Sequence, residues 1–181
     1  MTFASRLTRS PRPFDPARGA EAAALFTDLP PELRGLIDGT AGCSPYLKSL
    51  MEKEADWLRG ALSAAPEGAL TDLLDDLRAT DRRELPAALR RGKRRVALLA
   101  GLADLGGVWP LGQVTGALTE FADLAVDRAM KATVAAEIAR KKLPGMTQDD
   151  IATAGGMVAL AMGKMGAHEL NYSSDIDLIV L

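Results

Sequence analysis

The sequence predicts an α+β protein that is mostly helical at first and then changes to strands. Three observations lead to this prediction. Apolar residues recur at helical spacing from about residue 21 to residue 142. An uninterrupted apolar run at residues 157–162, next to Gly163, is typical of a strand that is buried on both faces. A second strand candidate, residues 175–181, ends the sequence.

The first helices are expected to begin mostly at prolines, which the first turn of a helix tolerates. We expect a short helix at about residues 21–28 and another at the proline pair that follows it. Ser44 and Pro45 form an N-cap and N1 pair for a helix that continues to about Ala65, and Pro66 begins the next helix.

Two further helices are expected after Pro86 and over residues 110–142. The first of these begins with a run of cations: Arg90, Arg91, Lys93, Arg94 and Arg95. The run is typical of a solvated helix surface, or else of a patch that faces phosphate or an acidic partner. The second is the longest helix, and its alanines allow close packing against neighbouring helices.

Composition shifts divide the chain into three regions. Residues 1–18, with three prolines and four arginines, lack helical periodicity and are expected to form an extended arm. Residues 19–143 are the helical region. Residues 144–181 begin a second domain, and the prolines, glycines and polar residues at its start indicate a junction.

The charge and the apolar runs exclude several classes of protein. A net charge of −2 and a pI near 5.5 argue against nucleic-acid binding, which needs a basic face. No apolar run approaches the roughly 20 residues that cross a bilayer. Cys43, the one cysteine, has no partner for an internal disulfide, and no apolar core of a secretory signal is present. We therefore expect a cytoplasmic protein with soluble partners.

Asp175 and Asp177 are the candidate metal ligands. On a strand, side chains two residues apart leave the same face, roughly 6.5 to 7 Å apart along the backbone. Pairs of Mg²⁺ ions in phosphoryl or nucleotidyl transfer lie about 3.5 to 4 Å apart and need hard oxygen ligands. Two carboxylates alone are equally typical of a solvated strand end.

The residues before this pair favour the chemical interpretation. Gly163 and Lys164 follow the first strand, so the backbone there can approach a phosphate closely with an ammonium group beside it. Ser174 can donate to phosphate oxygens or satisfy backbone groups of its own loop. His168, the sole histidine, is expected at the surface, and Glu169 can pair with Lys164 or orient the loop.

Residues 163–178, GKMGAHELNYSSDIDL, resemble the nucleotidyltransferase signature of the bifunctional glutamine synthetase adenylyltransferase/deadenylase family. Kanamycin-type and other polymerase-beta-like nucleotidyltransferases share only a Gly followed by Ser or Gly, then SDxD. Here Lys164 stands in place of the second small residue. Residues 169–172 are characteristic of the glutamine synthetase adenylyltransferase/deadenylase, and the similarity extends over about residues 86–181.

The resemblance implies the first strands of a polymerase-beta-like mixed sheet, truncated at Leu181. It also implies the amino-terminal, deadenylylating half of the enzyme, which removes AMP from a tyrosine of glutamine synthetase by phosphorolysis and produces ADP. By the same resemblance, Asp175 and Asp177 bind catalytic Mg²⁺, Gly163 and Lys164 line the phosphate-binding turn, and Ser174 supports the nucleotide.

Glutamine synthetase is the implied protein substrate, PII signal proteins and glutamine are the implied regulators, and ATP, ADP and phosphate are the implied small ligands. The family fold needs later strands and a third carboxylate, so the 181 residues alone are expected to be inactive. Two alternatives remain open. One is another nucleotidyltransferase, such as a protein uridylyltransferase, and the other is a helical protein-interaction module.

Overall fold

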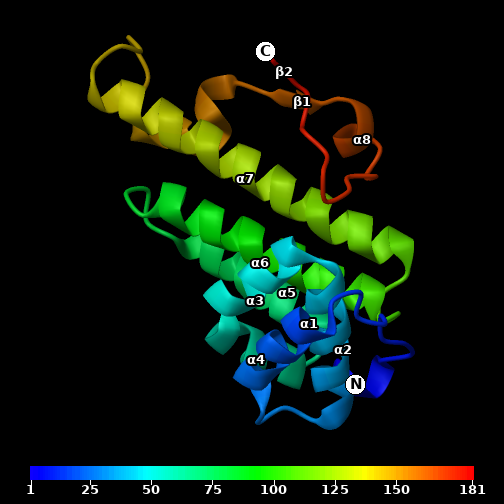
Figure 1. Cartoon of the computed structure of the whole chain (residues 1–181). Helices are drawn as coiled ribbons and strands as arrows, with labels where there is room; N and C mark the ends of the chain where they lie inside the picture. Colours follow the sequence, from blue (N-terminus) through cyan, green and yellow to red (C-terminus); the bar gives the residue numbers. More distant parts are fainter.

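A single long helix, α7 (Leu111–Ala139), separates two parts of the computed structural model, which describes residues 1–181. Helices α1 to α6 lie on one side of α7, and a two-stranded sheet with a short helix lies on the other (Figure 1). The chain starts in the helical part and ends in the sheet. Helix α7 is therefore the element through which the two parts are joined.

The helical part follows the proline pattern of the sequence. Its α-helices are α1 (Pro16–Ala23), α2 (Pro31–Cys43), α3 (Pro45–Lys53), α4 (Ala55–Ser63), α5 (Pro66–Ala79) and α6 (Leu85–Leu105). Two short 3₁₀ helices, η1 (Ala4–Arg6) and η2 (Ala24–Phe26), flank α1. The Ser44 hydroxyl accepts a hydrogen bond from the Leu47 N–H at 3.2 Å, which confirms the predicted N-cap of α3.

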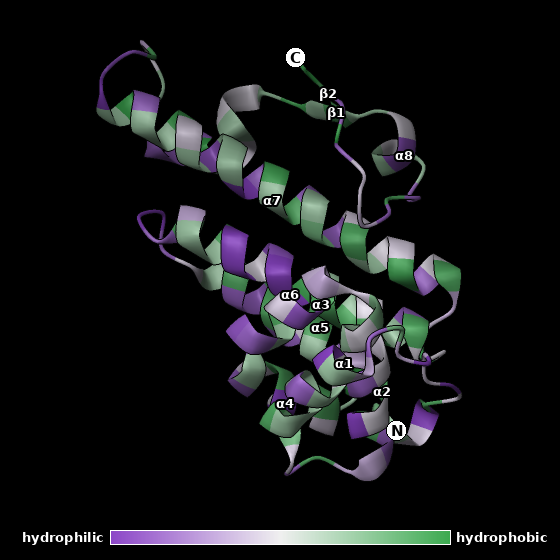
Figure 2. Cartoon of the chain, in the orientation of Figure 1, coloured by the Kyte–Doolittle hydropathy of each residue, from purple (hydrophilic) through white to green (hydrophobic).

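The main core lies where α2, α4 and the second half of α6 meet. Its fully buried members include Leu36, Ile37, Leu58, Leu98 and Leu102. Helix α6 changes character along its length, because its second and third turns are rich in cations and its last turns are apolar (Figure 2). The last turns of α6 therefore anchor the bundle, while the turns nearer its start carry the arginines.

One long helix was expected from Pro45 to about Ala65, and this prediction is wrong. The chain breaks at Glu54, which has a φ of −119° and a ψ of 26° and separates α3 from α4. Glu54 is 5% exposed, and its carboxylate accepts hydrogen bonds from Arg94 and Arg95 at 2.7 and 2.8 Å. A buried carboxylate needs hydrogen-bond donors or opposite charges, and the break between α3 and α4 places the Glu54 carboxylate next to these two arginines.

The first 15 residues contain only one short 3₁₀ helix, η1, and they pack along the bundle. Phe3 is fully buried in the main core. Arg6 donates two hydrogen bonds to the Glu67 carboxylate, at 2.6 and 2.8 Å, and one to the Val108 carbonyl at 2.9 Å. Side-chain contacts thus attach this segment to α5 and to the end of α6.

The sheet consists of β1 (Ala159–Ala161) and β2 (Leu178–Val180), which pair antiparallel. Between α7 and β1 lies η3 (Gln148–Gly156), a helical segment that was not expected from the sequence and that is interrupted at Ala154 and Gly155. Between the strands lies α8 (Gly163–Gly166), a single helical turn.

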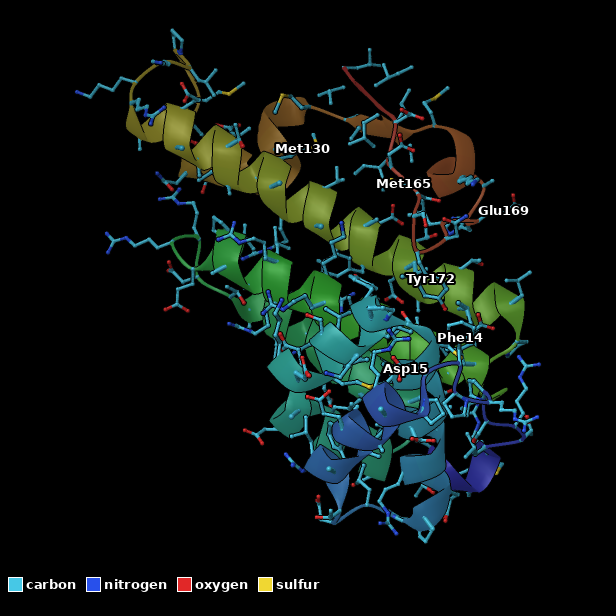
Figure 3. The ribbon with its side chains drawn as sticks, in the orientation of Figure 1. Phe14, Asp15, Met130, Met165, Glu169 and Tyr172 are labelled. Atoms are coloured by element: carbon cyan, nitrogen blue, oxygen red, sulfur yellow. The ribbon has the colours of Figure 1, made fainter.

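The prediction that residues 157–162 form a strand buried on both faces is wrong. Val158 and Leu160 are 54% and 44% exposed. Ala159 and Ala161 instead border a pocket of about 380 Å³ against α7, into which Met130 and Met165 also reach (Figure 3). Strand β1 has one partner strand, and α7 lies against one face of the sheet. Nothing in the structure covers the other face.

The architecture agrees with the predicted class, a mostly helical α+β protein with a small sheet at its end. None of its helices combines the length and the apolar character that a membrane span requires.

Candidate active site

The turn after β1 is shaped by two glycines of α8. Gly163 has a φ of +54°, a backbone conformation that favours glycine. At Gly166, a β-carbon would lie 2.4 Å from the Ala161 carbonyl oxygen, so only glycine lets α8 approach β1 so closely. Met165, between them, is 3% exposed and holds the turn against the sheet. The turn is thus fixed by backbone shape and by one apolar anchor.

Asp177 lies beside this turn. Its carboxylate oxygen Oδ2 is 4.0 Å from the position that a β-carbon would take at Gly163. The Met162 N–H donates to the Asp177 carbonyl at 2.9 Å, so Asp177, the residue just before β2, extends the β-ladder by one residue. One member of the predicted aspartate pair is therefore adjacent to the predicted phosphate-binding turn.

Asp175 lies two residues earlier, outside the ladder. A strand was expected over residues 175–181, but β2 begins only at Leu178. The partner strand ends at the turn into α8, where Gly163 takes its positive φ, so no neighbouring strand remains for Asp175 to pair with. Both carboxylates are exposed, and neither forms an ion pair.

Lys164 and Glu169 do not form the side-chain pair that the sequence suggested. The Glu169 N–H donates to the Lys164 carbonyl at 2.7 Å, so the two residues are linked through the backbone. The Lys164 ammonium is exposed beside the glycine turn. His168 is exposed as expected and has a φ of +58°. The Lys164 side chain is therefore free to meet an anion at the turn.

Ser174 closes a hydrogen-bonded loop with Asn171. Its hydroxyl donates to the Asn171 side-chain carbonyl at 2.9 Å and accepts from the Asn171 N–H at 3.1 Å. The Ser173 N–H donates to the same side-chain carbonyl at 3.0 Å. Ser174 thus satisfies polar groups of its own loop, one of the two roles expected for it, and holds the segment that leads into Asp175.

Tyr172 connects this loop to the helical part. Its hydroxyl lies 3.5 Å from the Asp104 carboxylate at the end of α6, and Figure 3 shows the side chain beside the helices below the loop. Partial burial of the ring, with the negative charge of Asp104 beside it, raises the pKa of the Tyr172 phenol above its usual range. The phenol is therefore a neutral donor near pH 7. Leu170, 4% exposed, is the second anchor of the loop.

A pocket of about 480 Å³ lies between this loop and helices α6 and α7. Asp175 and Ser174 border it on the loop side, Phe121 on the α7 side and Lys93 on the α6 side. Tyr46, from α3, completes the rim. Local sequence patterns could not indicate Lys93 or Tyr46 as neighbours of Asp175, because about 80 to 130 residues of chain separate them from it.

Asp175 and Asp177 supply hard oxygen ligands of the type that Mg²⁺ prefers. No group of three or more carboxylate, histidine or cysteine side chains gathers anywhere in the structure. Two carboxylates alone would leave the other positions around a hard cation to water or to a phosphate group, as is usual for Mg²⁺. The Lys164 ammonium at the adjacent turn suits a phosphate in the same place.

The turn at Gly163, the two aspartates and the helical region in front of them are the features that comparison with known proteins can place in a family. The model of the glutamate-ammonia ligase adenylyltransferase family matches residues 36–181. The chain belongs to this family.

Relatives from three bacteria show the same similarity over nearly the whole chain. The bifunctional glutamine synthetase adenylyltransferase/adenylyl-removing enzyme of Rhodopseudomonas palustris is 40% identical over 98% of the chain and 20% of its own length. The enzymes of the same name from Bradyrhizobium diazoefficiens and Xanthobacter autotrophicus are 42% and 39% identical over 92% and 97% of the chain. The chain spans about a fifth of the length of these relatives. No solved structure matches it.

Proposed function

We propose that this chain contributes the start of the AMP-removing site of an enzyme that regulates glutamine synthetase by reversible adenylylation of a tyrosine. The observation that supports the proposal most is the position of Asp177 beside the Gly163 turn, with Asp175 two residues before it. The names of the relatives include both an adenylyltransferase and an adenylyl-removing activity. The helical region in front of the signature favours the second of these for this segment.

In this proposal a phosphate oxygen attacks the phosphorus of the tyrosine-bound AMP. A new P–O–P bond forms and the bond from phosphorus to the tyrosyl oxygen breaks. The attacking hydrogen phosphate loses its proton and the tyrosyl oxygen gains one, so that ADP and a free tyrosine hydroxyl result. Bound Mg²⁺ would neutralise the charge that develops on the transferred adenylyl group. Asp175 and Asp177 would hold the metal, and the Lys164 ammonium would orient the attacking phosphate.

The Gly163 turn and the pocket beside Asp175 have room for the other parts of the substrate. The absence of a side chain at Gly163 leaves room for phosphate oxygens next to Asp177. The pocket beside Asp175, with Lys93 and the two tyrosines at its rim, is large enough for the nucleoside of the AMP group. Ser174 would support the nucleotide by keeping the loop into Asp175 in place.

The partners follow from the same proposal. Glutamine synthetase would be the protein substrate, with phosphate, ADP and ATP as small ligands, and PII signal proteins and glutamine as regulators. The enzyme would act in the cytoplasm, without a nucleic-acid or membrane partner. The two strands would begin the sheet of a polymerase-beta-like domain. Further strands and a third carboxylate would complete the site, so the 181 residues alone would be inactive.

The experiment measures phosphate-dependent release of ADP from adenylylated glutamine synthetase by the full-length enzyme. Asp175→Asn combined with Asp177→Asn should lower the rate by at least about 100-fold, because the charge on the transferred group loses its stabilisation. Asp123→Asn, a change at an exposed and unpaired carboxylate of α7, is the control and should leave the rate unchanged. An unchanged rate in the double variant would place the reaction elsewhere.

A further inference from the structure

We infer that the pocket between the α5–α6 loop, α7 and η3 binds a small molecule that carries a diphosphate group. The pocket has a volume of about 470 Å³. Arg82 and Arg83 border it from the loop, Arg128 and Lys131 from α7, and Gln148 from η3. We call it the basic pocket. It concentrates four cations in a chain whose net charge is −2.

Three of these cations have no anionic partner. Arg82, Arg83 and Arg128 form no ion pair, and the guanidinium groups of Arg82 and Arg83 form no hydrogen bond. Lys131 is neutralised by Asp127, with Nζ 2.8 Å from the carboxylate. Asp81 also borders the basic pocket and carries a negative charge. Its Oδ1 accepts a hydrogen bond from the backbone N–H of Arg83 at 2.8 Å. The basic pocket therefore has a surplus of positive charge.

Arg128 has unused donor capacity. One of its terminal nitrogens donates to the Thr80 carbonyl, which holds the guanidinium against the loop. Its Nε is buried and has no hydrogen-bond partner. The second terminal nitrogen forms no hydrogen bond, and a guanidinium readily donates to a phosphate. A phosphate that accepts from this nitrogen and from the loop arginines would use the donors that remain free.

The remaining walls favour an organic diphosphate over a bare ion. Leu85, Ala132, Ala135 and Ile151 supply an apolar surface beside the arginines. Three guanidinium groups can share the charge of two adjacent phosphoryl groups, whereas a single phosphate would leave part of the basic charge unmatched. A nucleoside diphosphate provides both the two phosphoryl groups and a surface for the apolar wall, whereas inorganic diphosphate provides only the charge.

The basic pocket is separate from the candidate active site. It shares no bordering residue with the pocket beside Asp175. Its α7 residues, Arg128 and Lys131, lie further along the helix than Phe121 and Ala125, which border the other pocket. In Figure 1 the α5–α6 loop projects at the end of the bundle away from α8. A ligand here would bridge the helical part to η3, the segment that leads into β1.

The test uses the full-length enzyme with Asp175→Asn and Asp177→Asn, without Mg²⁺, so that binding at the proposed active site is suppressed. Inorganic diphosphate and ADP are titrated separately, and amide hydrogen exchange is followed at residues 80–86 and 146–152. The expected result is saturable protection of both segments. Arg82→Ala with Arg83→Ala should weaken it at least about tenfold, since two charge-assisted contacts are lost.

A control variant separates a site from general charge attraction. Arg12→Ala with Arg90→Ala removes two exposed, unpaired arginines elsewhere and should leave the affinity unchanged. Tighter protection by ADP than by diphosphate would show that the apolar wall contacts a nucleoside, and equal protection would identify free diphosphate as the ligand. No protection at millimolar ligand, or an equal loss in both double variants, would overturn the inference. ADP release is not measured, so failure here leaves the proposed function untouched.

Discussion

Glu54 carries a buried charge at the point where α3 meets α4. Burial alone would raise the pKa of its carboxyl, but hydrogen bonds from Arg95 and Arg94 outweigh burial and lower that pKa below the ordinary value of 4.5. Arg95 also stacks on the Trp57 ring, with 5.3 Å between the guanidinium carbon and the ring centroid. Two of the five cations at the start of α6 thus stabilise the fold instead of facing solvent or a ligand.

The Glu54 cluster predicts an acid-dependent stability. Because the folded-state pKa is lower than the unfolded one, the stabilisation is present above about pH 4.5 and is lost as the pH falls through the folded value. Glu54→Gln should lower the free energy of unfolding at pH 7 by about 1–3 kcal/mol and flatten its decline below pH 4.5. Urea unfolding across pH 3–7 checks this, with the exposed Glu84→Gln as control. Parallel pH curves for wild type and Glu54→Gln would contradict it.

Gly163 predicts a separate, local effect. Gly163→Ala places a β-carbon on a backbone with a φ of +54°, which should cost about 1–2 kcal/mol and displace the turn beside Asp177. Gly60→Ala is the matched control, because Gly60 lies in α4 with open space around it. It should stabilise the protein by about 0.5–1 kcal/mol. Thermal unfolding of both variants measures the two effects. Equal shifts in the unfolding temperature would show that the turn tolerates a side chain.

At the scale of elements, the signature loop is anchored at Leu170 and Tyr172. Tyr172→Phe keeps the ring and loses only a long hydrogen bond, so stability should change by less than about 1 kcal/mol. Tyr172→Ala removes the ring from between the loop and the end of α6 and should speed amide hydrogen exchange over residues 170–177. Exchange in α2 serves as the internal control. Unchanged exchange in the loop of Tyr172→Ala would mean that Tyr172 is not an anchor.

The sequence predicted the elements that have strong local signals. Ser44, Pro45 and Pro66 mark helix starts because capping and proline geometry act within one turn. The break at Glu54 has no local signal, since its cause lies 40 residues away on α6. The segment η3 was missed because its capping box uses Thr147 and Asp150, with the shorter aspartate in place of glutamate.

For the candidate site, the sequence placed the Gly163 turn and Asp177 next to each other. It could not place Asp175, because the length of β2 depends on how far β1 extends before α8 begins. It also could not find Lys93 or Tyr46, which reach the site only through the packing of α3 and α6 under the loop. Local spacing predicts which residues lie at the turn, while tertiary packing determines what surrounds them.

At the scale of the whole molecule, the amino-terminal segment is part of the core. Phe3 is fully buried, whereas Phe14, in the same segment, is 88% exposed (Figure 3). Phe3→Ala should therefore destabilise the protein by about 3–5 kcal/mol, and Phe14→Ala should have little effect. Denaturant unfolding of the two variants compares a buried and an exposed phenylalanine directly. A small effect of Phe3→Ala would show that the segment does not contribute to the fold.

Two opposite reactions, AMP removal and AMP addition, are open to this part of the chain. Helix α7 joins a bundle of helices to a short sheet, and the candidate carboxylates lie in the segment just before β2. If they belong to the AMP-removing site, their loss should affect one reaction only. A longer relative carries both activities in its name, so both can be followed in one full-length enzyme.

The most direct measurement compares AMP addition from ATP and phosphate-dependent ADP release in the full-length enzyme with Asp175→Asn and Asp177→Asn. We expect release to fall by at least about 100-fold while addition is retained. Loss of addition with retained release would contradict it and would assign the opposite reaction to this segment.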